Sequence, residues 1–207
     1  MIAIIDYDAG NLKSVEKACL SLGQECVVTR TRRTILDADR VILPGVGSFG
    51  MAMDQLVRYE LDKVIREVAA SGKPFLGICL GLQLLFSGSE ESSGVEGLGL
   101  LPGRIVRIPD GGGLKIPHIG WNSLALLNDG RLFRNLPVQA DAQPYVYFVH
   151  SYYLVADDAS IVTAVTEYGV SMHVSVEQGN IFACQFHPEK SSAVGLQILK
   201  NFAGMGE

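Results

Sequence analysis

The first 86 residues alternate between short apolar stretches and longer stretches that place apolar residues at helical spacing. The apolar stretches predict buried strands at residues 2–6, 25–29, 40–43 and 74–79. The periodic stretches predict helices at residues 12–22, 51–70 and 80–86. Strands that alternate with helices through short connections favour a parallel sheet covered on both faces. We therefore expect a doubly wound, flavodoxin-like α/β fold with a mostly parallel sheet.

Beyond residue 88 this rhythm is lost, and the next helical pattern is the amphipathic stretch at residues 193–202. The strand candidates in between are short and lack intervening helices: residues 104–108, 123–127, 145–153, 161–165, 173–176 and 181–185. The second half is therefore expected to add antiparallel strands into or beside the main sheet. No internal repeat or long linker divides the chain, so residues 1–207 are expected to form a single domain.

Charge and cysteine content exclude several classes of protein. The net charge is −5 with seventeen scattered Lys and Arg residues, which argues against a nucleic-acid partner. The apolar start is too short for a signal peptide, and no stretch approaches the length of a membrane span. The four cysteines show neither metal-ligand spacing nor a disulfide framework. We expect a cytoplasmic protein with free thiols, no metal, no cofactor and no membrane partner.

A buried strand runs directly into a helix through Gly77-Ile78-Cys79-Leu80-Gly81, the sulfur version of the G-x-S-x-G nucleophile elbow. The sharp turn strains the backbone at the central cysteine, and the glycines remove side chains that would collide. The thiol would stand at the carboxyl end of the sheet, where amides at a helix start favour the thiolate. The alternative is a buried core cysteine beside two turn glycines.

A second strand candidate is followed by His187-Pro188-Glu189. A nucleophilic thiol needs an imidazole to accept its proton, and the imidazole needs a carboxylate to fix its tautomer. Residues two apart in extended backbone point to the same side, and proline stiffens the step between them. We therefore predict Cys79, His187 and Glu189 as catalytic residues, because none of the other three histidines has a carboxylate two positions on. A plain surface carboxylate remains the alternative for Glu189.

The glycine-rich loop Gly45-Val46-Gly47 follows another strand candidate. Acyl transfer at a carboxamide needs two amide N–H groups directed at the oxyanion, and glycine permits that backbone orientation. We assign the backbone amides of Val46 and Leu80 to this role. Ordinary turn glycines are the alternative, whereas a phosphate-binding loop would require a following Lys-Ser/Thr. Gln83 lies one helical turn beyond the cysteine and is expected to contact substrate, or else to be exposed.

The segments GICLGLQ (residues 77–83) and FHPE (186–189) resemble the triad (class I) glutamine amidotransferases in order, and the resemblance covers essentially the whole chain. Five further segments resemble the glutaminase subunits of imidazole glycerol phosphate synthase, from histidine biosynthesis. They are DYDAGNL (6–12), PGVGSF (44–49), HIGWN (118–122), YFVHSY (147–152) and HPEKS (187–191).

This resemblance implies that L-glutamine is hydrolysed to glutamate through a thioester on Cys79. Ammonia would pass to a (β/α)8-barrel cyclase subunit of a heterodimer, which makes imidazole glycerol phosphate and aminoimidazole carboxamide ribotide. The resemblance implies a glutamine pocket shaped by Gly45, Gly47, Gln83, Ser151 and Tyr152. It also implies a partner-facing set of Asn11, Trp121, Tyr147 and Lys190. A core position for Trp121 and an ordinary helix-start charge at Lys190 are the alternatives.

Other functions remain open on the sequence alone. The chain could serve another triad amidotransferase, in anthranilate, aminodeoxychorismate or pyridoxal phosphate synthesis, although the segments around Trp121 and Lys190 argue against this. A cysteine hydrolase or peptidase acting alone would use glutamine poorly and need no partner. A non-catalytic binding module would leave the combination of Cys79, His187 and Glu189 unexplained.

Overall fold

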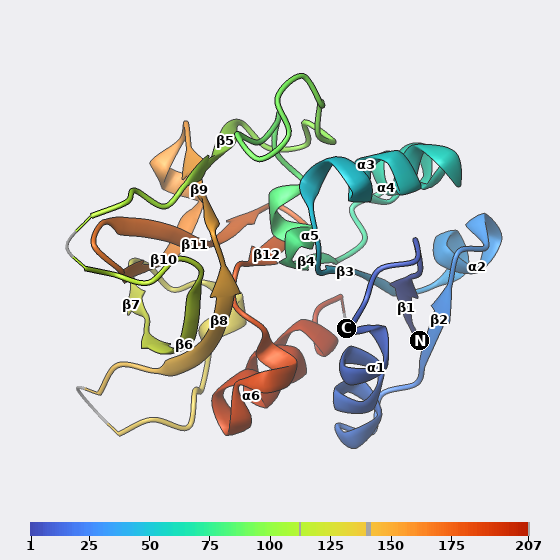
Figure 1. The fold of residues 1–207 in the computed structure, drawn as a ribbon. Coiled ribbons are helices and arrows are strands. Elements are labelled where there is room, and N and C mark those ends of the chain that lie inside the picture. The colour runs from blue at the N-terminus through green and yellow to red at the C-terminus, as the bar shows by residue number, and fades with distance from the viewer. Residues whose placement is uncertain (112, 140–141, 207) are drawn as a thin grey trace.

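The computed structural model describes residues 1–111, 113–139 and 142–206. Within these residues a sheet of ten strands crosses the molecule (Figure 1). Its parallel part contains β1 (Ile2–Ile5), β2 (Cys26–Thr29), β3 (Arg40–Gly45), β4 (Phe75–Cys79) and β12 (Ile181–Cys184). These strands lie in the order β2-β1-β3-β4-β12, and every neighbouring pair is parallel. All five strands were predicted from the sequence.

Helices cover both faces of this parallel part (Figure 1). They are α1 (Leu12–Ser21), α2 (Arg32–Asp37), α3 (Phe49–Arg58), α4 (Leu61–Ala70) and α6 (Ser192–Ala203). Alternate residues of β1 belong to two separate cores: Ala3 and Ile5 pack with α2, α3 and α4, whereas Ile2 and Ile4 pack with α1 and α6. This alternation follows from the period of two along a strand, and it confirms the doubly wound fold.

Three helical regions differ from the prediction. Residues 51–70 form two helices, because Glu60 adopts a left-handed conformation (φ 57°) between them. The short α2 was not predicted, since Ile35 is its only buried residue. The helix predicted at residues 80–86 ends early, as α5 (Leu80–Gln83). The carbonyls of Leu84, Leu85 and Phe86 instead accept hydrogen bonds from the amides of residues 98–101, which prevents a longer helix.

The second half supplies the antiparallel strands that were expected: β5 (Gly103–Arg107), β7 (Ala125–Leu126), β9 (Tyr152–Ala156), β10 (Val162–Glu167) and β11 (Ser171–Gln178). They extend the main sheet beyond β12. The strand predicted at residues 145–153 is divided at Ser151, and its first part is β8 (Tyr145–His150). β8 pairs with β6 (His118–Ser123), which was not predicted, in a separate two-stranded sheet.

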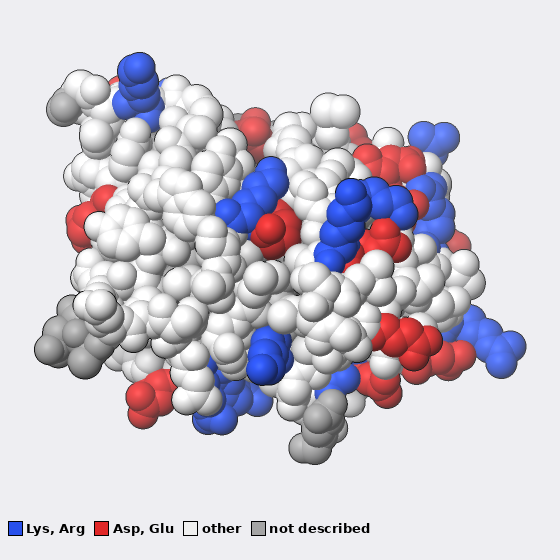
Figure 2. All heavy atoms as spheres, turned by 90° about the horizontal axis from the view of Figure 1, so that it is seen from below, with Lys and Arg blue, Asp and Glu red and all other residues white. Residues whose placement is uncertain are grey.

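The surface shows no concentration of positive charge on the face seen from below. Lys and Arg side chains lie there singly or in small groups, interspersed with Asp and Glu and with large uncharged areas (Figure 2). Among the described residues, no helix combines the length and the apolar character needed to cross a membrane.

Candidate active site

The carboxyl end of β4 turns sharply into α5 at Cys79, whose φ of 56° and ψ of −111° are rare for a residue with a side chain. A Cβ at Gly77 would lie 2.7 Å from the carbonyl oxygen of Gly81, and a Cβ at Gly81 would lie 1.9 Å from that of Leu43. The strained turn and its need for both glycines were predicted. Because α5 has only four residues, its dipole is weaker than the predicted helix implied.

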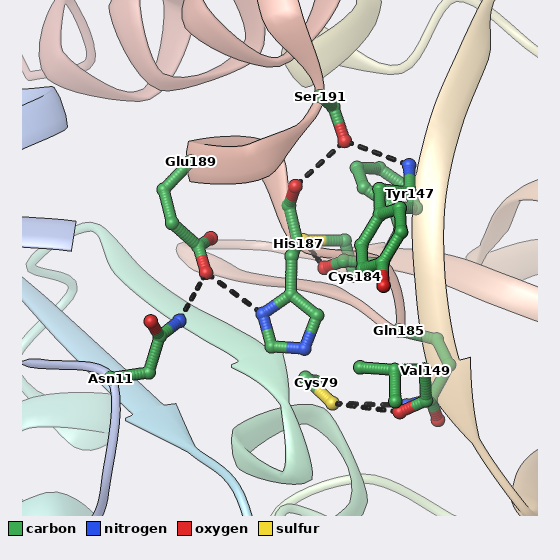
Figure 3. A network of polar contacts seen from close by, with 10 residues as sticks. Asn11, Cys79, Tyr147, Val149, Cys184, Gln185, His187, Glu189 and Ser191 are labelled. Carbon is green, nitrogen blue, oxygen red and sulfur yellow. Dashed lines mark hydrogen bonds and ion pairs between the residues drawn. The ribbon is translucent and has the colours of Figure 1, made fainter. Parts of the chain in front are cut away.

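His187 follows the end of β12, and its side chain is 1% exposed. Its Nδ1 donates a hydrogen bond to Oε1 of Glu189 at 2.8 Å, and the Glu189 side chain is fully buried. The other ring nitrogen, Nε2, is buried without a hydrogen-bond partner and faces the sulfur of Cys79 (Figure 3). The structure therefore brings together the three predicted catalytic residues, with the imidazole between the thiol and the carboxylate.

The position of His187 determines its protonation. Burial by itself lowers the pKa of His187, but the adjacent Cys79 sulfur and the Glu189 carboxylate outweigh it and raise the pKa to about 9. The imidazole therefore holds a proton at neutral pH. A protonated imidazole beside the cysteine can act as a general acid towards a leaving group.

Two neighbouring side chains fix the positions of His187 and Glu189. Asn11, which was predicted to face a partner, donates its amide to Oε1 of Glu189. Ser191, which was not predicted as a site residue, donates its hydroxyl to the carbonyl of His187 at 2.6 Å. The same hydroxyl accepts from the amide of Tyr147 on β8 at 3.0 Å (Figure 3). Segments far apart in the sequence thus fix the imidazole and its carboxylate.

A cavity of about 300 Å³ lies beside the cysteine. Most of the predicted site residues line it: Val46, Gly47, Cys79, Leu80, Gln83, Ser151 and Tyr152. Four lining residues were not predicted: Glu91, Pro117, Val149 and His150. The nucleophile, the residues assigned to the oxyanion site and the predicted substrate residues Gly47, Gln83, Ser151 and Tyr152 therefore share one cavity, whereas Gly45 does not line it.

Tyr7, which is 2% exposed, packs against the loop that carries Val46. The Tyr7 hydroxyl donates to the carbonyl of Pro44 at 3.0 Å, and a Cβ at Gly45 would lie 2.2 Å from the hydroxyl oxygen. Burial, and to a lesser extent the nearby Cys79, raises the pKa of Tyr7, so that its hydroxyl stays neutral and donates. Gly47 adopts φ 109°, which favours glycine.

Glu91 contributes a carboxylate to the cavity lining. Its Oε2 accepts a hydrogen bond of 2.7 Å from the amide of Phe49, at the start of α3. A fixed carboxylate in this position complements the ammonium group of an amino-acid ligand. Glu91 lies in a stretch without periodic pattern, so no local signal in the sequence identifies it.

Gln83 is not exposed, so the exposed alternative from the sequence is wrong, whereas its predicted contact with substrate stays a prediction. The residue is 5% exposed. Its Nε2 donates to the carbonyl of Tyr152 at 3.1 Å and to Oε1 of Gln185 at 2.9 Å. Gln83 therefore lines the cavity while its amide nitrogen is used within the protein.

A pair of histidines lies behind the cavity wall. Nδ1 of His150 is 2.9 Å from the carbonyl of Tyr152, which can only accept, so this nitrogen carries a proton. Nε2 of His150 lies 3.0 Å from Nδ1 of His118. Burial lowers the pKa of both histidines to about 4, so both are neutral and His118 donates to His150.

We expect this pair to weaken the fold in acid. The folded-state pKa values of about 4 lie below the ordinary 6.5, so the unfolded state binds protons more readily between these values. Stability should therefore fall as the pH drops from 6.5 towards 4. Urea unfolding at several pH values measures this. His118→Asn keeps a donor amide near the position of Nδ1 but removes one titrating group. The unfolding free energy of the variant should therefore depend less steeply on pH, by about one bound proton. Equal slopes for the native protein and the variant would contradict the assignment.

Of the residues predicted to face a partner, Trp121, Tyr147 and Lys190 lie around β6 and β8, whereas Asn11 directs its side chain to Glu189. Trp121 is 51% exposed, with its ring edge against Tyr147 at a centroid distance of 6.2 Å, so the core alternative for Trp121 is wrong. Lys190 is exposed next to the triad carboxylate residue. In the described part of the chain, no cluster of three or more His, Cys, Asp or Glu side chains is arranged to hold a metal ion.

Comparison with known proteins gives consistent matches along the chain. The family model described as glutamine amidotransferase class-I matches residues 3–204. The imidazole glycerol phosphate synthase subunit HisH of Moorella thermoacetica is 54% identical over 97% of this chain and 93% of its own length. The HisH subunit of Syntrophotalea carbinolica is 48% identical over 99% of this chain and 100% of its own length.

Solved structures resemble the fold at lower sequence identity. The structure of PurLQS from Thermotoga maritima matches with a TM-score of 0.75 and 21% identity, over 100% of this chain and 98% of that chain. The glutaminase domain of Trypanosoma brucei CTPS, with bound acivicin, matches with a TM-score of 0.62 and 17% identity, over 98% of this chain and 93% of that chain. These matches support the fold and, at such identities, nothing more specific.

Proposed function

The chain belongs to the class-I glutamine amidotransferase family, and within it to the family of the HisH subunits of imidazole glycerol phosphate synthase, and we propose on that premise that Cys79, His187 and Glu189 are its catalytic residues. It is a glutaminase of histidine biosynthesis.

In the first half of the reaction the thiolate of Cys79 attacks the side-chain amide carbon of glutamine, and a carbon–sulfur bond forms. The negative charge moves to the amide oxygen, where the backbone amides of Val46 and Leu80 stabilise it. The imidazolium of His187 then gives its proton to the departing nitrogen. The carbon–nitrogen bond breaks, ammonia leaves, and a thioester remains.

In the second half a water molecule attacks the thioester while His187 accepts its proton. The oxyanion forms again at the same two amides, the carbon–sulfur bond breaks, and glutamate leaves with Cys79 returned to thiolate. Glu189 keeps Nδ1 protonated and stabilises the imidazolium. Glu91 would bind the α-ammonium group of the substrate, and Gly45, Gly47, Ser151 and Tyr152 would shape the pocket.

The observation that carries this proposal is the buried Nε2 of His187, which has no hydrogen-bond partner and faces the Cys79 sulfur beside the cavity. A histidine that served only the fold would have both nitrogens bonded. Here one nitrogen is bonded to Glu189 and the other is directed at a strained cysteine. That arrangement suits proton transfer between sulfur and substrate.

We further propose that residues 1–207 act as one cytoplasmic domain that delivers ammonia to a (β/α)8-barrel cyclase subunit through the surface around Trp121, Tyr147 and Lys190. The four free cysteines fit a reducing compartment. Glutamate release should rise when the cyclase subunit is added, since coupling prevents wasteful hydrolysis. Identical release with and without the cyclase would contradict coupled delivery and favour a hydrolase that acts alone.

Replacing Glu189 with glutamine is expected to lower the pKa of His187 below about 9, because the variant loses the anion that helps to raise it. Activity should fall by about 100-fold or more, since the imidazolium is no longer stabilised. NMR titration of the His187 ring and glutamate release measure the two effects. Glu67→Gln removes a comparable carboxylate from an exposed ion pair with Arg32 and should change neither. An unchanged His187 titration in Glu189→Gln would refute the assignment.

A further inference from the structure

Gln185 is completely buried immediately after β12. Its side chain lies between the nucleophile and Gln83. Nε2 of Gln185 is 3.6 Å from the Cys79 sulfur, and Oε1 accepts from Nε2 of Gln83 at 2.9 Å. Figure 3 shows Gln185 next to Val149 on one side of the sulfur, with the His187 ring on another.

The hydrogen-bond network fixes which end of the Gln185 amide faces the sulfur. The carbonyl of Tyr152 can only accept, so the group that Gln83 directs at it must be the NH2. The second hydrogen of that NH2 is directed at Gln185, which must therefore present its oxygen. The NH2 of Gln185 is left for the sulfur. A rotated amide would place two donors against each other and an oxygen against the sulfur.

An N–H donor and a carbonyl have opposite effects on a thiol. The carbonyl of Val149, 4.0 Å from the sulfur, can bond only to the protonated S–H form. The NH2 of Gln185 bonds best to the thiolate, since hydrogen bonds to a charged acceptor are stronger. Gln185 and His187 therefore favour the thiolate from two directions.

We propose that Gln185 is a further catalytic residue, which donates a hydrogen bond to the thiolate of Cys79, and that Gln83 is a positioning residue, which orients the Gln185 amide. This inference deepens the proposed function and rests on it. It gives Gln83 a role different from the substrate contact that the sequence suggested. The His118–His150 pair supports the same network, because His150 also donates to the carbonyl of Tyr152.

The test measures the pH dependence with which iodoacetamide alkylates Cys79, followed by mass spectrometry of the Cys79 peptide. Alkylation reports the thiolate fraction and needs neither glutamine nor a partner. The ionisable groups that face the sulfur or its hydrogen-bonded neighbours come from several elements: Tyr7 after β1, Glu91 at the cavity, His150 on β8, Cys184 on β12, and His187 with Glu189 beyond it. All of them remain in the variants.

Gln185→Met keeps most of the side-chain volume and removes the donor. The midpoint pH of alkylation should rise by about one to two units, and the turnover number for glutamine should fall about tenfold or more. Gln83→Leu should raise the midpoint by a smaller amount, because the Gln185 amide is then free to rotate. Gln197→Met makes the same chemical change on α6, where Gln197 bonds to Asn201, and should leave the midpoint unchanged.

An unchanged midpoint in folded Gln185→Met would overturn the proposal. If Gln185→Met fails to fold, Gln83→Leu decides: a raised midpoint supports the network, and a raised KM for glutamine with no shift of the midpoint overturns it. Glutamate release by the native protein, measured in parallel, distinguishes failure of the glutaminase mechanism from failure of the role proposed for Gln185. Absence of release together with shifted midpoints would refute only the proposed glutaminase mechanism.

Discussion

Cys79→Ala is expected to release glutamate at less than about one ten-thousandth of the native rate, with or without a cyclase subunit. Alanine fits the site but offers no nucleophile, so no thioester forms and the remaining groups cannot replace it. Alanine keeps the Cβ and the same backbone conformation, so the variant should fold about as well as the native protein. Release of glutamate from glutamine, assayed in a coupled reaction, measures the effect.

Cys184→Ala provides the matched control. Cys184 is also fully buried, lies on the neighbouring strand β12, and burial raises its pKa well above the ordinary value, which makes it a poor nucleophile. Its replacement should cost some stability and leave the turnover number within about threefold of native. Undiminished activity of Cys79→Ala, or an equal loss in both variants, would remove Cys79 from the mechanism.

Gly81→Ala is expected to destabilise the fold by about 3 kcal/mol or more and to abolish activity. Its Cβ would lie 1.9 Å from the carbonyl oxygen and 2.9 Å from the carbonyl carbon of Leu43, atoms of the β3 backbone that cannot rotate away. Relief of this overlap requires α5 to move from β3, which displaces Cys79 and the Leu80 amide together. Urea unfolding and glutamate release measure the two losses.

The control for this prediction is Gly88→Ala. A Cβ at Gly88 would lie 3.4 Å from the carbonyl oxygen of Val95, an ordinary contact. The stability of Gly88→Ala should stay within about 1 kcal/mol of native. A Gly81→Ala variant as stable and active as Gly88→Ala would show that the elbow can open without cost, contrary to the close packing of α5 on β3.

Some elements of this structure could be predicted because a short run of consecutive residues is enough to indicate them. The parallel strands and the cysteine, histidine and glutamate of the triad each follow from a few consecutive residues. β6 could not be predicted, because His118 is its only fully buried residue and its register is set by pairing with β8. α2 was missed for a similar reason, since one buried isoleucine gives no periodicity.

The contacts of Glu91, Gln185 and Asn11 around the triad depend on packing between distant segments, which no local sequence pattern indicates. Glu91 reaches the cavity because its carboxylate bonds to the first amide of α3. Gln185 meets the sulfur because β12 pairs in parallel with β4, in a register that joins Cys184 to Ile78. Asn11 and Glu189, 178 positions apart, meet only in the folded chain. None of these contacts has a spacing that could be recognised beforehand.

The last strand along the chain, β12, lies in the middle of the sheet, between β4 and β11. During synthesis Cys79 therefore leaves the ribosome about one hundred residues before the strand that leads to His187. Until β12 is inserted, a nascent chain has a thiol without a base beside it and cannot consume glutamine. The same chain exposes the edges of β4 and β11, so the insertion of β12 ends both the inactivity and the risk of aggregation.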